Sequence, residues 1–185
     1  MNLITIIVIA VGLAMDTFAV SIATGSTSKQ VKVKQALLMA LFFGGFQLVM
    51  PLIGSLAGLT LKKYIAGYDH WVAFGLLAAV GGKMIYESFK LKTARRNFNF
   101  SNIFVLLILS IATSIDALAV GITLSLITSS IAVAVIIIGL ITFTLSYVGV
   151  FIGQKAGRFF ENKIEAIGGL ILIGIGVKIV LQHLL

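Results

Sequence analysis

Long apolar stretches separated by short polar connections run through the whole of this chain. Six of these stretches reach about the 20 residues that a helix needs to cross a hydrocarbon core roughly 30 Å thick. They lie near residues 3–24, 36–59, 71–89, 102–124, 130–153 and 165–184. The pattern therefore predicts an all-α polytopic membrane protein, with six transmembrane helices in a single transmembrane domain over residues 1–185.

The composition excludes a soluble globular domain. Hydrophobic residues make up 59% of the 185 residues and charged residues 11%, whereas soluble domains are about 25% charged. Cysteine is absent, which rules out disulfides and thiolate metal sites. The first residues carry no basic side chain, so we expect no cleaved signal peptide.

Charged residues gather in the connections, and their distribution predicts how the helices are oriented. The second connection holds only Lys62 and Lys63. The first, third and fifth connections hold ten basic residues: Lys29, Lys32, Lys34, Lys90, Lys92, Arg95, Arg96, Lys155, Arg158 and Lys163. Because short basic loops stay in the cytoplasm, the odd connections are predicted to be cytoplasmic and both termini external. This asymmetry explains the net charge of +8, and we expect no nucleic-acid partner.

A linker at residues 90–101 divides the chain into two three-helix halves, residues 1–89 and 102–185. The first helices of the two halves carry similar motifs, MDTFAVSI at 15–22 and SIDALAVGI at 114–122. Aligning Asp16 with Asp116 also aligns Ile22 with Ile122. Further matches follow in order along the second and third helices: Gly54 and Gly58 with Gly153 and Gly157, and Lys83 with Lys178.

These matches predict an internal duplication. Because each half has three spans, the second copy must be inverted in the membrane. Inverted repeats place a substrate site near the midplane, between the halves, and are typical of secondary transporters. The glycine pairs are interpreted as structural positions that let helices pack closely.

Asp16 and Asp116 stand in the middle of apolar helices, roughly 20 Å from a membrane surface at about 1.5 Å per residue. An ionised residue at that depth costs at least about 2.5–3.5 kcal/mol. Small residues flank each acid on its own helix face, and small faces let helices approach closely. We expect the first and fourth helices to meet with their acids facing, as a cation site. The alternative is two structural acids that pair with Lys83 or Lys178.

Neutral oxygen donors extend the predicted metal site. Proline has no N–H, so Pro51 leaves the carbonyl of Gln47 without its helical partner, and Gln47 is assigned as a metal ligand together with Asp16 and Asp116. Ser146 is the nearest polar counterpart in the fifth helix. The wider metal or proton pathway is predicted to include Met15, Thr17, Ser21, Thr113, Ser146 and Thr144. Such an oxygen-rich set favours a hard or borderline divalent cation, Mg²⁺ or Mn²⁺.

Lys83 and Glu87 lie four residues apart toward the cytoplasmic end of the third helix. A local ion pair and snorkelling of the lysine to the surface account for both. No lysine or arginine is then expected near the midplane. This argues against an amino-acid substrate, whose carboxylate would need a buried cation.

Five motifs together resemble the MntP family of bacterial manganese efflux pumps. They are MDTFAVSI at 15–22, MPLIG at 50–54, HWVAF at 70–74, SIDALAVGI at 114–122 and GGLILIGIGVKI at 168–179. The resemblance covers essentially the whole chain and implies export of Mn²⁺ across the bacterial cytoplasmic (inner) membrane, with Asp16 and Asp116 essential. The amide of Gln47 offers no protonatable group, and the family's Gly-Lys pair at the end of the first helix is absent, because Ser26 follows Gly25.

The residues and the resemblance together predict a secondary transporter and not an enzyme. No Walker motif is present, so ATP does not drive transport directly. Moving two positive charges outward against 100 mV costs about 4.6 kcal/mol, which favours proton antiport with alternating access at the midplane site. Mn²⁺ is then the transported substrate and no cofactor is required. The expected partners are the metal ion, protons and the lipid bilayer.

Two alternatives stay open at this point. One is an exporter of another small cation or of an amino acid. The other is an intramembrane aspartyl protease, although those enzymes carry Gly-x-Gly-Asp, whereas the acids here follow Ala-Met and Ser-Ile. The residue pattern leaves the choice of metal and the formation of an oligomer open.

Overall fold

The computed structural model describes residues 3–27, 31–65, 69–90, 103–127, 131–156, 170–171, 173–175, 177 and 180–181. These residues form five continuous helices: α1 (Leu3–Thr27), α2 (Val33–Ile65), α3 (Asp69–Lys90), α4 (Ile103–Ile127) and α5 (Ile131–Ala156). The described residues between 170 and 181 are also helical, where the sixth span is expected. No strand occurs in this part of the chain, so the prediction of an all-α polytopic membrane protein is confirmed.

Within the described residues, four helices are long and apolar enough to cross a membrane, and the apolar part of the third helix is shorter. The spans run over Leu3–Ser26, Val33–Thr60, Ile103–Leu126 and Ile131–Lys155, whereas the apolar part of α3 covers only Trp71–Lys83. Helix α2 begins earlier and ends later than its apolar stretch predicts. Lysine and glutamine are good helix formers, so the helix continues into its polar flanks.

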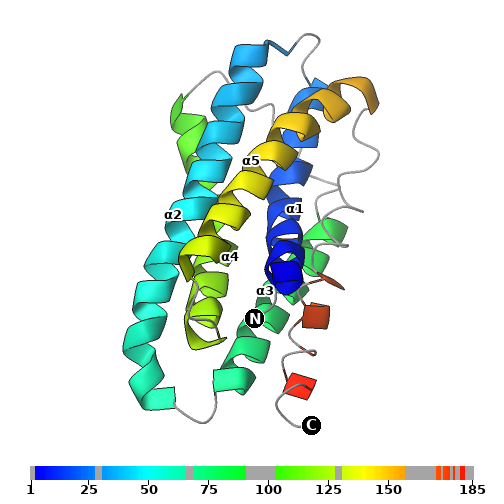
Figure 1. The fold of residues 1–185 in the computed structure, drawn as a ribbon. Coiled ribbons are helices and arrows are strands. Elements are labelled where there is room, and N and C mark those ends of the chain that lie inside the picture. Colours follow the sequence, from blue (N-terminus) through cyan, green and yellow to red (C-terminus); the bar gives the residue numbers. More distant parts are fainter. Residues whose placement is uncertain are drawn as a thin grey trace.

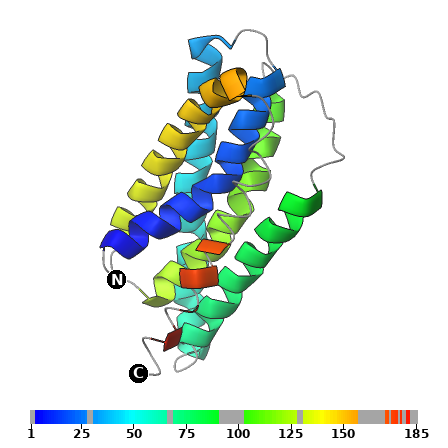
Figure 2. The ribbon, with the colours of Figure 1, turned by 90° about the vertical axis from the view of Figure 1, so that its right-hand side faces the viewer.

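Helices from the two halves of the chain pack against each other (Figures 1 and 2). Helix α1 packs mainly along α5, and α2 packs along α4 and α5. Helices α1 and α4 meet, as expected, but only over a short stretch, and each packs more extensively on another helix. Helix α3 packs on α4 at the edge of the bundle. The first helix of each half therefore packs on the second helix of the other half.

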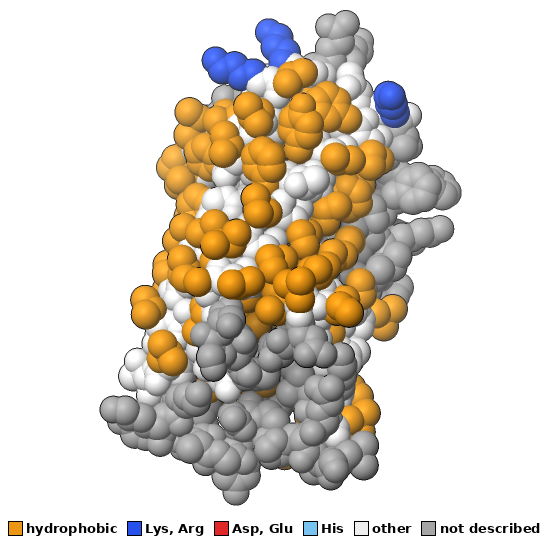
Figure 3. All heavy atoms as spheres, in the orientation of Figure 1, with side chains coloured by type: hydrophobic (Ala, Val, Ile, Leu, Met, Phe, Trp, Pro, Cys, Tyr) orange, Lys and Arg blue, Asp and Glu red, His pale blue; other side chains and the backbone are white. Residues whose placement is uncertain are grey.

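The outer surface separates apolar and basic side chains. On the face in Figure 3, hydrophobic side chains cover the middle, and lysine side chains lie at the upper end. Figure 1 shows that the end of α1, the start of α2 and the end of α5 meet at this end. Lys32, Lys34 and Lys155 are exposed. An apolar groove of about 350 Å³ also lies on α2, lined by Leu41, Phe42, Gly45, Phe46 and Val49.

Two buried clusters hold the helices together. The larger one joins α1, α3, α4 and α5 through fully buried residues such as Leu13, Leu77 and Ile138. The smaller one joins α2, α4 and α5 around Phe43 and Leu106. Burying a large aliphatic or aromatic side chain away from the polar phase contributes about 1.5–3 kcal/mol in water, but within a bilayer the close fit between helices is the more important term.

Glycines bring α2 against the backbone of α4. A Cβ at Gly54 would overlap the carbonyl of Leu118, and one at Gly58 would overlap the hydroxyl of Ser125 and the carbonyl of Ile122. From the other side, a Cβ at Gly121 would overlap the backbone of Pro51. No side chain fits between the two helices at these three positions.

The contact between α1 and α5 is built in the same way. A Cβ at Gly149 would press on the ring of Phe18, and one at Gly153 would overlap the carbonyl of Ile22. Phe18 and Ile22 stand 100 residues before Leu118 and Ile122, which face Gly54 and Gly58 across the other pair of helices.

These contacts correct the register of the glycine match. Gly54 was predicted to correspond to Gly153, but by contact it corresponds to Gly149, and Gly58 corresponds to Gly153. The sequence comparison is one helical turn off because small-xxx-small patterns repeat along α5 and spacing alone does not choose among them. Gly157 lies outside the described residues. The duplication and its inversion stay predictions.

The glycine contacts predict a local loss of stability on enlargement. Gly54→Val should lower the free energy of unfolding by about 1–3 kcal/mol or more, as expected for overpacking against backbone that cannot move aside. Thermal unfolding of the detergent-purified protein measures the change. Gly45→Val is the matched control on the same helix, because a Cβ at Gly45 meets nothing within 4 Å. Equal melting temperatures for the two variants would contradict the close contact.

Candidate functional site

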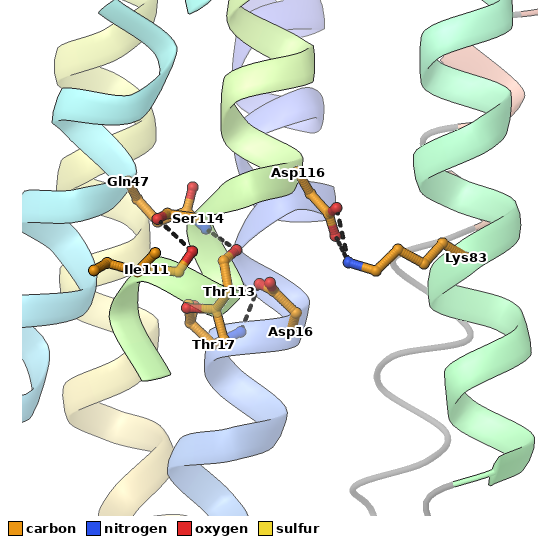
Figure 4. A network of polar contacts seen from close by, with 8 residues as sticks. All are labelled: Asp16, Thr17, Gln47, Lys83, Ile111, Thr113, Ser114 and Asp116. Carbon is orange, nitrogen blue, oxygen red and sulfur yellow. Dashed lines mark hydrogen bonds and ion pairs between the residues drawn. The ribbon is translucent and has the colours of Figure 1, made fainter. Parts of the chain in front are cut away.

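Asp116 is a buried carboxylate that is bound by a lysine (Figure 4). Its residue is 6% exposed, and the Nζ of Lys83 donates to Oδ1 at 2.9 Å and to Oδ2 at 3.1 Å. Both carboxylate oxygens are therefore engaged by one ammonium group. The side chain of Lys83 is 43% exposed and that of Asp116 8%, so the pair is covered on the side of α4 and open on the side of α3.

The position of Lys83 follows from the packed face of α3. Ala73, Leu77 and Val80 are buried and stand at helical spacing on one face. Lys83 is three residues after Val80 and continues that face toward α4. The expectation that Lys83 snorkels to the membrane surface is wrong, and the alternative in which an acid pairs with Lys83 is confirmed for Asp116. The predicted partner Glu87 has a side chain outside the described residues.

Asp16 is only partly buried, and one of its contacts is on its own helix. Its Oδ1 accepts the backbone N–H of Thr17 at 2.6 Å. Figure 4 shows Asp16 and Asp116 in one close-up, with the Asp116 carboxylate turned toward Lys83 on α3. Lys178, the other lysine considered as a partner for an acid, lies outside the described residues.

Several predicted pathway residues face the protein interior with their hydroxyl protons already used. Thr17 donates to the carbonyl of Ala14 at 2.9 Å, and Ser21 donates to the carbonyl of Thr17 at 2.7 Å. Thr113 donates to the carbonyl of Leu109 at 2.9 Å. The oxygen atoms of these hydroxyls keep lone pairs that can accept from water or bind a cation.

Two predicted pathway residues lie elsewhere. Thr144 is exposed and donates to the carbonyl of Leu140 at 2.8 Å, so it stands on the outer face of α5. Met15 packs against the larger apolar cluster. The structure therefore does not bring either side chain to the polar residues of α2 and α5.

Gln47 is fully buried, and only one of the two polar atoms of its side chain has a hydrogen-bond partner. Its Nε2 donates to the carbonyl of Thr113 on α4 at 3.2 Å, whereas its Oε1 has no partner. Helix α2 continues through Pro51, which provides no N–H for the carbonyl of Gln47. Gln47 thus brings an unused amide oxygen and a backbone carbonyl that lacks its helical donor into the interior.

Two hydroxyls on α5 differ from every other buried hydroxyl in the described part of the chain. Ten serine and threonine side chains are buried there. Eight donate to a carbonyl of their own helix, as such residues in helices commonly do. The two exceptions, Thr142 and Ser146, are completely buried and have no partner.

Thr142 and Ser146 form one strip on α5 together with Gly139 and Gly149. The spacings of three, four and three residues put all four on one helix face. Gly139 contacts the backbone of Gly44 on α2, and Gly149 contacts α1. The strip therefore runs from the contact with α2, where Gln47 lies one turn after Gly44, to the contact with α1.

Thr142 is a residue that sequence reasoning missed. Thr144 was chosen because it is close to Ser146 in sequence, but two residues along a helix reverse most of the facing direction. A usable signal existed: Thr142 follows Gln47 by 95 residues, as Gly139 follows Gly44 and Lys178 follows Lys83.

The set of groups suits a cation bound largely by neutral oxygens. No group of three or more His, Cys, Asp or Glu side chains converges in the described residues. Two carboxylates, the amide oxygen of Gln47, the hydroxyls of Thr142 and Ser146 and water molecules are the oxygen donors on offer. Hard divalent cations such as Mg²⁺ are commonly held by one or two carboxylates and retain several waters.

Comparison with known proteins identifies the family. Residues 30–180 match a family model described as "Putative manganese efflux pump". A protein of Gloeothece citriformis is 50% identical over 184 residues, which cover 100% of this chain and 97% of the relative. A protein of Methanosarcina mazei is 47% identical, with 100% and 98% covered, and one of Clostridium perfringens is 47% identical, with 99% and 96% covered. All three relatives are named "Putative manganese efflux pump MntP".

No solved structure matches the chain. The family model covers most of the sequence, and the relatives match it from end to end at about half identity. The chain therefore belongs to the Mntp family.

Proposed function

We propose that this protein exports Mn²⁺ from the cytoplasm as a secondary transporter. The observation that carries the proposal is the full-length match to relatives named as manganese efflux pumps. Four helices long and apolar enough to cross a membrane, with a buried carboxylate among them, support a membrane transport role. The family is one of transporters, which removes the protease alternative.

The proposed cation site uses Asp16 and Asp116 as charged ligands and Gln47 as a neutral one. Buried acids inside membrane helices are costly and mark ion pathways by default. The unsatisfied Oε1 of Gln47 supports its role, because a buried acceptor without a donor is stabilised by a cation or by water. Ser146 and Thr142 continue the path with hydroxyls that no helix carbonyl occupies.

Alternating access is proposed to occur between the two halves. The contacts support this, because α1 on α5 and α4 on α2 are the same contact with the halves exchanged. Helices α2 and α5 cross at Gly44 and Gly139, where each glycine lies against the backbone of the other. Rocking of one repeat against the other around such a crossing is the common mode in inverted-repeat transporters.

The proposed orientation places the basic end in the cytoplasm of a bacterial inner membrane. The exposed Lys32, Lys34 and Lys155 support it, because they lie on the first and fifth connections or beside them, and basic connections stay inside. Both termini are then external.

Proton antiport is the proposed coupling. Outward movement of Mn²⁺ against 100 mV costs about 4.6 kcal/mol, and exchange for two protons would remove that electrical cost. An amino-acid substrate is less well supported. The lysine that could bind its carboxylate is held by both oxygens of Asp116.

The role of the acids predicts a loss of export when either is neutralised. Asp16→Asn and Asp116→Asn should each lower Mn²⁺ export by tenfold or more, since even residues that only support metal ligands commonly contribute about 10–100-fold. Cellular manganese content and growth in excess Mn²⁺ measure the effect, with the amount of protein in the membrane determined in parallel. Wild-type tolerance in cells that carry either variant at normal membrane levels would contradict the assignment.

Proton coupling predicts that a pH gradient drives transport. In proteoliposomes that contain the protein and Mn²⁺, a proton gradient directed against the metal flux should accelerate Mn²⁺ movement, and Mn²⁺ movement should in turn carry protons across the membrane. A Mn²⁺-sensitive dye and a pH-sensitive dye record the two fluxes. Metal flux that does not change with the imposed proton gradient would contradict antiport and would indicate a gated uniporter.

The orphaned hydroxyl of Thr142 predicts that stability and activity respond in opposite directions. Thr142→Val should keep or raise the melting temperature, because it removes a buried polar group without a partner. Export should fall by about fivefold, which corresponds to the ~1 kcal/mol of a typical hydrogen bond. Thr144→Val is the matched control on the outer face of α5 and should leave export unchanged. Equal export rates for the two variants would contradict a role for Thr142.

A further inference from the structure

The ion pair between Lys83 and Asp116 occupies the proposed cation site. The ammonium contacts both carboxylate oxygens, at 2.9 and 3.1 Å, and these are the atoms that a divalent metal would bind. A metal ion and an ammonium group repel each other at such short distances. Metal and Lys83 therefore exclude each other at Asp116.

The surroundings of Lys83 allow the ammonium to leave. Lys83 lies in the second half of α3, seven residues before the helix ends at Lys90, so its long side chain can extend toward the polar end of the helix. The side chain is 43% exposed, and the neighbouring Gly82 has open space around it. Lysine stems commonly lie along apolar surface with the charged group in the polar phase, which is the position to which a displaced ammonium would move.

The contacts of α3 suit a helix that can move relative to the other four. Helices α1, α2, α4 and α5 interlock through glycine contacts between their backbones. Among these four helices, α3 packs extensively only on α4. A Cβ added at Gly75 or Gly82 on α3 would have no atom within 4 Å, so neither glycine makes a close contact of this kind. Figure 2 shows α3 along the edge of the bundle.

We propose that Lys83 is a tethered counter-cation that neutralises Asp116 whenever the metal is absent, and that Mn²⁺ enters the site by displacing it. After the metal leaves, Lys83 returns to the carboxylate. Asp116 is then paired in both the loaded and the empty transporter, so this carboxylate is not left unpaired when the protein changes conformation. This inference rests on the proposed function and adds to it the competition between the lysine and the metal.

Competition predicts tighter metal binding when the lysine is neutralised. Lys83→Met should bind Mn²⁺ about tenfold more tightly than wild type, because a site closed by its own lysine nine-tenths of the time loses about that factor in affinity. Export by the same variant should become slower, since the empty carrier keeps an unpaired carboxylate. Equilibrium dialysis of the detergent-purified protein against Mn²⁺ alone measures the affinity.

Two further variants separate competition from a structural role. Lys83→Arg keeps the charge and should bind Mn²⁺ no more tightly than wild type. Lys155→Met removes an exposed lysine at the end of α5 and should leave the affinity unchanged. A purely structural Lys83 would instead give weaker Mn²⁺ binding and a lower melting temperature in Lys83→Met.

The wild-type protein supplies a test that needs no substitution. Mn²⁺ should increase the rate at which a small amine-reactive reagent modifies Lys83 by several-fold, measured by peptide mass spectrometry with Lys155 as the internal reference. Labelling of Lys83 that is unchanged or slowed by Mn²⁺, or affinity in Lys83→Met that is equal to or weaker than that of wild type, would overturn the competition while leaving Mn²⁺ export in place. Absence of saturable Mn²⁺ binding by the wild-type protein would overturn the proposed function itself.

Discussion

A carboxylate among apolar helices must be neutralised by a cation or by a proton, and much of this structure follows from how that requirement is met at Asp116. An uncompensated charge at such a position costs several kcal/mol, and breaking a buried pair by removing one partner costs about 3–5 kcal/mol. Lys83 meets the requirement from a different helix. The pair therefore ties α3 to α4 by charge at the edge of a bundle whose other members are joined by backbone contacts. An ion pair can be exchanged for another cation, whereas an interlocked backbone cannot.

Close backbone contact has a second consequence, which concerns the neutral oxygens. Glycines at the crossings bring the backbone of α5 close to α2 and to α1, which leaves no room for lipid at those points. Gln47, Thr142 and Ser146 are buried on these helices with oxygen atoms that no protein donor or acceptor meets. Each such buried group costs about 1–3 kcal/mol when left unsatisfied. A structure that keeps three of them together is explained most simply if water or a cation reaches them during the transport cycle.

Sequence reasoning predicted the features that depend on single helices. Apolar length gave the helices, and the depth of Asp16 and Asp116 marked both acids as exceptional. Prediction from the sequence failed for side chains whose surroundings depend on which way a helix faces. Lys83 was assigned to the surface because its distance from the helix end is known from sequence, but its direction toward α4 depends on packing of Leu77 and Val80. Thr144 was chosen in place of Thr142 for the same reason, and the glycine match was shifted by one turn.

The proposed site combines two carboxylates with neutral oxygens, and this combination suits transport better than storage. A site made of several carboxylates would hold a divalent cation too tightly to release it. In the proposed site, Lys83 competes for Asp116 and would lower its effective affinity for the metal, and the strip on α5 would offer ligands without charge. A metal ion that moves from Asp116 toward Thr142 and Ser146 exchanges strong ligands for weak ones, while Lys83 takes its place at the carboxylate. Release is then assisted at the point where the ion would otherwise remain bound.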